Sequence, residues 1–151
     1  MKIDNLKKLD LISAKIFQKI SKSDCIFLFG EIGVGKTTFA RSLIQHIQRK
    51  KKLHQTDVLS PTFNLVYEYD LKDLKIMHYD LFRIENSKDI KQLGIFQNYE
   101  KTVKIIEWPE LICDKIADKL EIYFKYCKKE NERIITFEGF GKWKNFTIHE
   151  I

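Results

Sequence analysis

Residues 30–37 place glycines, a lysine and a threonine at a spacing that suits the binding of phosphate. The segment reads GEIGVGKT and fits the pattern G-x-x-x-x-G-K-[ST] at every fixed position. Glycines let the backbone curl so that successive N–H groups point inward, and the N-terminus of a following helix adds partial positive charge. Lys36 can then reach the β- and γ-phosphates, and the Thr37 hydroxyl can bind Mg²⁺. The motif therefore predicts a site for ATP or GTP with magnesium.

Apolar segments on both sides of the motif support this interpretation. CIFLF at 25–29 is typical of a short buried strand, and a helical stripe of apolar residues follows Lys36. Phosphate binding by such a loop requires a strand before it and a helix after it, so this context argues against a chance match. The motif residues that we expect at the nucleotide are Gly30, Glu31, Ile32, Gly33, Val34, Gly35, Lys36 and Thr37.

Two carboxylates follow predicted strands and are candidates for the metal side of the site. Glu107 ends VKII, and Asp80 ends KIMHY. A phosphate-binding loop of this type needs a carboxylate at the end of a neighbouring strand to hold the metal or its water shell. Any one carboxylate at a strand end is often only a solvated residue or a helix cap. Parallel α/β sheets collect ligands at the carboxyl ends of their strands, which favours a functional role here.

The segment HYDLFR brings His78, Asp80 and Arg83 together. Asp80 could orient the attacking water or bind magnesium through water, and Arg83 could neutralise phosphate charge. Alternatively, Asp80 caps a turn and Arg83 pairs with a surface carboxylate. The spacing alone does not separate these two interpretations.

Two further features allow both a functional and a structural interpretation. Trp108 could stack on a base or on a partner, although a tryptophan after an apolar strand is more often half-buried core. Ser60 and Thr62 in LSPTFNL could belong to a loop whose hydroxyl senses the γ-phosphate, or the segment could be a plain turn.

The remaining patterns predict alternating helices and strands. An amphipathic helix is expected where one face carries Leu6, Leu9, Ile12, Ile16 and Ile20. Alternation over 63–69 and the apolar run 76–82 predict an antiparallel hairpin, and a short helix is plausible from Ser87 to Leu93. A strand at 102–108 ends before Pro109, and 119–127 pairs with 133–140 through the turn KKENE.

These elements define the expected fold class. We predict an α/β fold of the P-loop NTPase type, in which a mixed sheet with a parallel core and antiparallel additions is flanked by helices. A length of 151 residues suits one domain with a sizeable core, so we expect a single P-loop ATPase domain over 1–151.

The net charge of +6 and the basic run QRKKKLH at 48–54 allow contact with a nucleic acid. The positive charge is nearly all lysine and is mixed with carboxylates along the chain, which is more typical of a solvated surface. The run also follows a predicted helix, where cations suit the C-terminal dipole.

Cysteine, histidine and apolar patterns exclude several other classes. Cys25, Cys113 and Cys127 stand at unrelated spacings, which indicates free thiols in a reducing compartment. His46, His54, His78 and His149 are scattered, so the sequence gives no support for zinc. No apolar run approaches the roughly 20 residues that span a bilayer, and the N-terminus lacks a secretory pattern, so we expect a cytoplasmic protein without membrane contact.

Four linked motifs resemble one known family. GEIGVGKTTF, SPTFNLVYEY, HYDLFR followed by LGI, and IIEWPE occur in the order and approximate spacing of the bacterial TsaE, or YjeE-like, proteins. The resemblance covers roughly 25–110. It implies an ATPase that works with the TsaB–TsaD pair in making threonylcarbamoyladenosine beside the anticodon of tRNAs that read codons beginning with A. The family protein does not transfer the threonylcarbamoyl group itself, and its ATP cycle supports its partners, with tRNA as the indirect substrate.

The resemblance also implies roles for particular residues. By motif, Thr37 and Glu107 would ligate Mg²⁺, and Lys36 with the backbone of Gly33 to Thr38 would hold the phosphates of ATP. Glu107 and Lys36 would thereby serve catalysis.

The resemblance implies roles for two more residues, and this sequence departs from the family pattern at two places. Asp80 would be needed for hydrolysis, and Trp108 would lie near the nucleotide. The threonine expected ahead of the first helix is absent, which leaves Leu9 and Asp10 in that vicinity and no adenine or ribose contact to name. Asp89 stands where the family often has glutamate.

Two rival functions use the same loop. A small-molecule or nucleotide kinase needs arginines that clamp its acceptor and a lid that excludes water, but the chain has only four arginines. A non-catalytic adaptor would use bound ATP only to order a partner-binding surface. The two strand-end carboxylates favour hydrolysis over this second rival.

Overall fold

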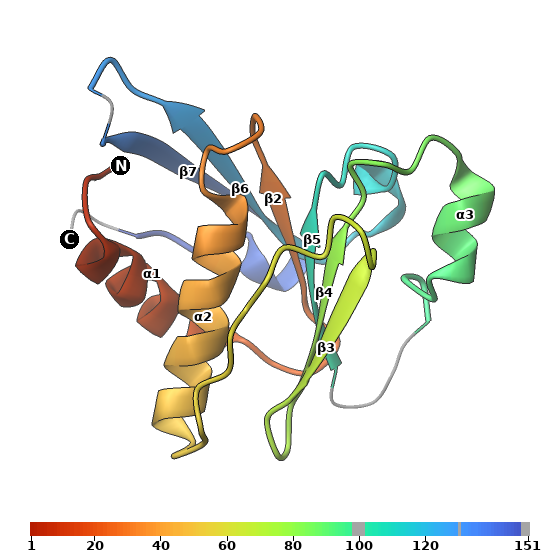
Figure 1. Ribbon diagram of the computed structural model, residues 1–151, viewed down its shortest axis with the longest axis horizontal. Helices are drawn as coiled ribbons and strands as arrows, with labels where there is room; N and C mark the ends of the chain where they lie inside the picture. The colour runs from red at the N-terminus through yellow and green to blue at the C-terminus, as the bar shows by residue number, and fades with distance from the viewer. Residues whose placement is uncertain (98–101, 130, 149–151) are drawn as a thin grey trace.

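The computed structural model describes residues 1–97, 102–129 and 131–148 (Figure 1). His149 and Glu130, which belong to the histidine and turn predictions, lie outside these ranges. In chain order the helices and strands are β1 (Lys2–Ile3), α1 (Leu6–Lys19), β2 (Cys25–Phe29), α2 (Lys36–Lys50), β3 (Val66–Asp70), β4 (Lys75–Asp80), α3 (Ser87–Gln92), β5 (Thr102–Glu107), η1 (Cys113–Lys115), β6 (Lys119–Tyr126), β7 (Arg133–Phe140) and η2 (Gly141–Trp143).

The strands form one sheet of seven in the order β1-β7-β6-β2-β5-β4-β3. Strands β6, β2, β5 and β4 run parallel. Strand β3 pairs antiparallel with β4 at one side of this core and β7 pairs antiparallel with β6 at the other, where β1 in turn pairs antiparallel with β7. The predicted fold class, a parallel core with antiparallel additions, is therefore confirmed. All six residues of β5 are buried, as expected for a central strand covered on both faces.

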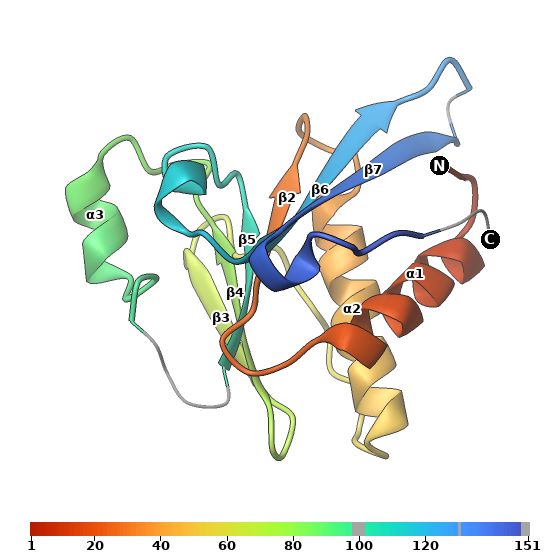
Figure 2. The ribbon, with the colours of Figure 1, turned by 180° about the vertical axis from the view of Figure 1, so that it is seen from behind.

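Helices α1 and α2 lie side by side and cover one face of the sheet (Figures 1 and 2). Ile12 and Ile16 of α1 and Leu43 and Ile47 of α2 are fully buried in one apolar cluster with residues of the strands. The apolar stripes that predicted these two helices are thus the surfaces that attach them to the sheet.

A second, smaller cluster fills the opposite face. Ile90 of α3 and Ile112, just before η1, pack with Phe27, Tyr79 and Ile106 of the central strands. This packing supports the ends of β4 and β5, where the candidate carboxylates lie.

The hairpin of β3 and β4 starts later than the sequence suggested. Phe63 was expected in a strand from 63, but it lies in a turn, and its side chain is 83% exposed. The turn closes when the Leu65 N–H donates to the Pro61 carbonyl at 2.6 Å, with Leu65 at a φ of 65°. This tight turn interrupts the extended chain, so the alternation of apolar residues over 63–65 is not a strand.

The N-terminal segment differs from the prediction in two ways. Leu6 was assigned to the buried face of the first helix, yet it is 69% exposed because it occupies the first helical position, next to the cap Asn5. Strand β1, which pairs with β7, was not predicted. Its two residues are too few to show any periodicity.

The helices are short. Helices α1, α2 and α3 have 14, 15 and 6 residues. Within the part of the chain that the structure describes, none of them is both long enough and apolar enough to cross a bilayer.

The burial of α1 gives a test of the fold. Ile12→Ala should lower the free energy of unfolding by about 2–5 kcal/mol, because it leaves a cavity between the helix and the sheet. Leu11→Ala, on the same helix but at a side chain 48% exposed, should change it by less than about 0.5 kcal/mol. Urea unfolding followed by circular dichroism measures both, and equal losses would contradict the assigned helix face.

Candidate nucleotide-binding site

The loop between β2 and α2 has a backbone that only glycine adopts easily. Gly30, Gly33 and Gly35 have φ values of 141°, 75° and 119°. A Cβ on Gly30 would also lie 2.6 Å from the carbonyl oxygen of Phe124, a distance that real Cβ contacts do not show. The glycines of the motif are therefore required by the shape of the loop as well as by its proposed ligand.

The loop leads directly into the N-terminus of α2. Gly35 occupies the N-cap position, and no side chain of the described residues caps this helix end. The first-turn N–H groups and the positive end of the helix dipole therefore remain available to an anion, and phosphate is the anion that such loops bind.

Lys36 lies folded against this loop. Its Nζ donates to the carbonyl oxygens of Gly30 at 2.5 Å and Glu31 at 2.9 Å, and it lies 3.8 Å from the centroid of the Trp108 ring. Burial lowers the pKa of the Lys36 ammonium below its usual value, whereas the nearby carboxylates act in the opposite direction.

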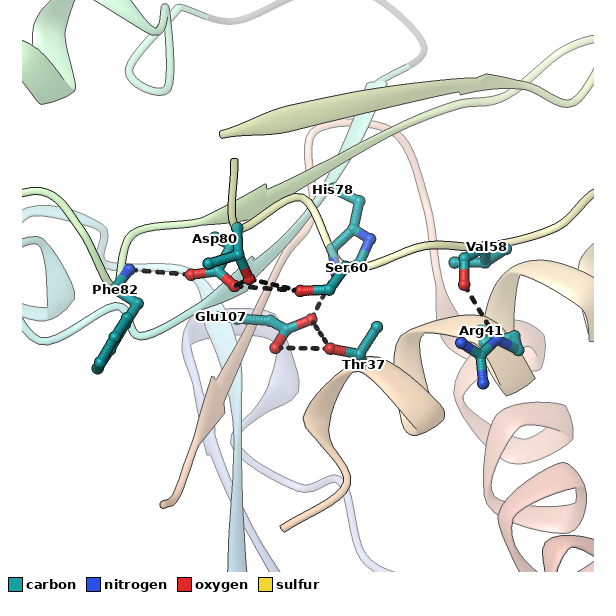
Figure 3. A network of polar contacts seen from close by, with 9 residues as sticks. Thr37, Arg41, Val58, Ser60, His78, Asp80, Phe82 and Glu107 are labelled. Carbon is teal, nitrogen blue, oxygen red and sulfur yellow. Dashed lines mark hydrogen bonds and ion pairs between the residues drawn. The ribbon is translucent and has the colours of Figure 1, made fainter. Parts of the chain in front are cut away.

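Glu107 is buried at the end of β5 and joins two other elements (Figure 3). The Thr37 hydroxyl lies 2.9 Å from Oε1 and 3.1 Å from Oε2, so its single O–H is shared between the two oxygens. The His78 Nε2 lies 2.8 Å from Oε1. A hydroxyl and a carboxylate held together are hard oxygen donors, and Mg²⁺ prefers such donors, so these residues fit that ion.

Asp80 is buried at the end of β4, next to Glu107 in the sheet register. Its Oδ2 accepts hydrogen bonds from the hydroxyls of Thr62 at 2.8 Å and Ser60 at 3.4 Å. Its Oδ1 accepts from the Phe82 N–H at 2.9 Å (Figure 3). Asp80 therefore holds a turn, as one of the two interpretations predicted, and it also lines the same cleft as Lys36. A role of Asp80 toward water or magnesium stays a prediction.

Trp108 is half-buried and forms a wall of the site. Its φ of 57° is rare for a large residue, and its backbone N–H donates to the Leu28 carbonyl at 3.3 Å. The ring packs on Phe82 at a centroid distance of 4.8 Å. The side chain thus lies both against the protein and at the cleft, so the two interpretations of Trp108 are compatible.

These side chains surround a cleft of about 270 Å³. It is lined by Ile32, Gly33, Gly35, Lys36, Thr37, Thr38, Ser60, Thr62, Asp80, Phe82, Glu107 and Trp108. Of the predicted nucleotide residues, Gly30 and Glu31 reach Lys36 only through their carbonyls, and the Val34 side chain is buried in the core. Arg83 does not line the cleft, because its guanidinium lies 5.0 Å over the exposed Phe63 ring.

A second hollow of about 400 Å³ adjoins the other side of the loop. It shares Gly33, Gly35 and Thr38 with the cleft, and its walls come from the N-terminal segment and from β6 and β7, including Leu9 and Arg133. The sequence gave no sign of it, because segments more than a hundred residues apart form its walls.

The structure adds contacts that the motifs did not reveal. His78 was noted without a role, although its position two residues before Asp80 places both on the same face of a strand. Ser60 and Thr62 hydrogen-bond Asp80 directly, which a turn pattern cannot show. Phe82 was not considered, yet it lines the cleft.

The other candidate features take ordinary places. Cys25, Cys113 and Cys127 are free thiols, and burial raises the pKa of Cys25 to about 11. Across residues 1–97, 102–129 and 131–148, no group of three or more histidine, cysteine or acidic side chains is arranged to hold a metal. In the basic run, Lys51 is paired with Asp73.

The fold and the site together define a class of protein. An α/β fold with a mixed sheet, and with a glycine-rich loop between its first parallel strand and the next helix, is of the P-loop NTPase type. The crystal structure of Bacillus subtilis YdiB has the same fold, with a TM-score of 0.71 and 24% sequence identity over 93% of this chain and 84% of that chain.

Sequence comparison then narrows the class to one family. The family model described as threonylcarbamoyl adenosine biosynthesis protein TsaE matches residues 3–135. A Rickettsia prowazekii protein named tRNA threonylcarbamoyladenosine biosynthesis protein TsaE is 38% identical over 109 residues, which are 72% of this chain and 73% of that protein. A Bacillus subtilis protein of the same name is 30% identical over 141 residues, 91% of this chain and 84% of that protein. The chain belongs to the TsaE family.

Two glycine substitutions test the shape of the loop. Gly35→Ala should lower the free energy of unfolding by about 1–3 kcal/mol from its positive φ alone, since the described residues leave its Cβ open space. Gly30→Ala has the same kind of backbone strain plus a clash with the Phe124 carbonyl, which should lower it by about 1–3 kcal/mol more. Urea unfolding of both variants measures the difference, and a larger loss for Gly35→Ala would contradict this loop geometry.

Proposed function

We propose that this chain binds ATP with Mg²⁺ in the cleft and hydrolyses it to support a TsaB–TsaD pair that makes threonylcarbamoyladenosine in tRNA. One observation carries the proposal. The same cleft, at the carboxyl edge of the parallel strands, is lined by Lys36, Thr37, Asp80 and Glu107. Membership of the TsaE family supports the pathway. The reaction is placed in the cytoplasm, which suits the free thiols.

The loop and Lys36 hold the phosphates in this proposal. Backbone N–H groups from Gly33 to Thr38 face the phosphate chain at the start of α2. The Lys36 ammonium leaves the carbonyl oxygens of Gly30 and Glu31 and turns to the β- and γ-phosphates.

Thr37 and Glu107 form the metal side of the proposed site. The Thr37 hydroxyl donates a hydrogen bond to Glu107, which leaves its lone pairs for a cation. Held by Thr37 and Glu107, Mg²⁺ would neutralise negative charge on the phosphates. Two buried carboxylates, Asp80 and Glu107, share this edge of the cleft, so the site itself favours an added positive charge.

Asp80 orients the attacking water in this mechanism. Its oxygens are fixed by Thr62, Ser60 and Phe82, so the carboxylate has a defined direction. The water oxygen bonds to the γ-phosphorus, and the bond from that phosphorus to the bridging oxygen breaks, which releases ADP. One proton of the water stays on the oxygen that is now bound to phosphorus, and the other passes to another oxygen of the released phosphate. Lys36 stabilises the charge that develops on the transferred group.

The second hollow is the place we propose for the nucleoside. It adjoins the loop at Gly35 and Thr38, and Leu9 and Phe124 give it apolar walls. A base needs such a surface, whereas the phosphates need the polar cleft. The two spaces on either side of the loop together match the two halves of a nucleotide.

The arrangement does not favour a kinase. An acceptor clamp needs arginines in the cleft, and none of the four lines it within the described part of the chain. A contact within the protein already engages each of the four arginines, which are Arg41, Arg49, Arg83 and Arg133. A pure adaptor has no need of an oriented carboxylate such as Asp80.

The decisive experiment measures phosphate release by the pure chain, alone, with TsaB and TsaD, and with tRNA. We expect slow release alone and stimulation by the two proteins. Asp80→Asn, which keeps the shape of the side chain, should bind ATP about as the wild type does and lose about 10²–10⁴-fold of the stimulated rate. Unchanged turnover would remove Asp80 from the mechanism, and transfer of phosphate to a small acceptor without stimulation would favour the kinase.

Nucleotide binding itself can be followed by fluorescence. The chain has two tryptophans: Trp108 lines the cleft, whereas Trp143 is fully buried in the core on the side of α1 and α2. Adding ATP should change the emission, because Lys36 moves away from the Trp108 ring. Trp108→Phe should abolish the change and Trp143→Phe should keep it. A signal that survives Trp108→Phe would place the nucleotide elsewhere.

A further inference from the structure

His78 is a fully buried histidine with one polar contact that reaches the proposed metal site. Its side chain is 0% exposed, and its Nε2 lies 2.8 Å from Oε1 of Glu107 (Figure 3). Because a carboxylate oxygen can only accept, Nε2 is the donor in this bond. The ring's other nitrogen, Nδ1, has no hydrogen-bond partner among the described residues. The contact with Glu107 is therefore the polar interaction that compensates for burying the ring.

The sheet register explains why His78 can reach this carboxylate. Asp80 of β4 pairs with Glu107 of β5, and His78 pairs with Ile105. His78 and Asp80 are two residues apart and lie on the same face of β4, so His78 reaches diagonally along the strand to Glu107. One strand thus supplies Asp80 to the cleft and a support for Glu107 from within the sheet.

The two oxygens of Glu107 are not equally engaged. Oε1 receives the His78 bond and the shorter Thr37 contact, whereas Oε2 has, among the described residues, only the 3.1 Å contact with Thr37. Lys36 carries a positive charge close enough to interact with the same carboxylate. Without the bond from His78, the carboxylate keeps only its contacts with Thr37 among the hydrogen bonds of the described residues, and these are less able to oppose a rotation toward Lys36.

We propose that His78 is a positioning residue that fixes Glu107 in the rotamer that serves the Mg²⁺–nucleotide complex. It touches neither nucleotide nor metal and acts through Glu107 alone. The proposal rests on the proposed function, since it assigns a support to the metal side of that site. Groups that hydrogen-bond the ligands of a metal typically contribute 10–100-fold to metal affinity or activity.

Two substitutions separate positioning from packing. His78→Gln places an amide N–H near the position of Nε2 and can still donate to Glu107, whereas His78→Leu fills the space without a donor. His46→Leu is a matched control. His46 is also buried, with one bond to a carboxylate at Asp10 and one nitrogen without a partner among the described residues, but it lies between α1 and α2.

The measurement is ATP affinity by titration calorimetry, in EDTA and over a range of Mg²⁺ concentrations. For His78→Leu we expect affinity in EDTA like the wild type and a rise of about 10–100-fold in the Mg²⁺ concentration that gives half of the metal effect. His78→Gln should recover most of this loss, and His46→Leu should show the wild-type Mg²⁺ dependence even if its thermal unfolding temperature falls.

Three results would overturn the proposal. The first is a wild-type Mg²⁺ dependence in folded His78→Leu, and the second is an equal loss in His78→Gln and His78→Leu, which would indicate packing alone. The third is a wild-type chain whose ATP affinity ignores Mg²⁺, which would remove the proposed metal site and this support for it together. The first two leave the proposed function intact, so the two failures are distinguishable.

Discussion

The hydrogen bond between the Thr37 hydroxyl and the Glu107 carboxylate is the contact on which the arrangement of the site depends. It joins the start of α2 to the end of β5, and the two bonded residues are 70 positions apart in the chain. The loop takes its position from the first of these elements, and the carboxylates take theirs from the second and its neighbour β4. Because the bond is partly buried, water competes with it less than at the surface, so it can fix the distance between the two halves of the cleft.

The parallel core makes this contact possible. Strands β2, β5 and β4 point the same way, so the loop after β2 and the carboxylates that end β5 and β4 meet at one edge of the sheet. The apolar clusters on the two faces hold the three strands in register. A slip of one residue in β4 would turn Asp80 and His78 to the opposite face, so the register determines the chemistry of the site as much as the residue types do.

Much of the site could be predicted because its signals are local. The loop needs glycines, a lysine and a threonine within eight positions, and strand ends can be read from short apolar runs, which located Asp80 and Glu107. Contacts between distant segments could not be predicted in this way. The bond from His78 to Glu107 depends on which strands are neighbours, and the turn that exposes Phe63 depends on a backbone bond from Leu65. The second hollow combines the N-terminal segment with residues of β6 and β7, and no local pattern records that proximity.

The contacts of Lys36 with the loop determine what an incoming anion must replace. The Lys36 ammonium donates hydrogen bonds to two carbonyl oxygens of the loop, so a side chain of the loop itself satisfies them. These carbonyl oxygens would otherwise need ordered water as their hydrogen-bond partner, and the bonds from Lys36 help to hold the loop in one shape. Entry of an anion is therefore a displacement of one set of contacts by another. Such a displacement lowers the net affinity, because the contacts that are lost offset part of what the anion gains.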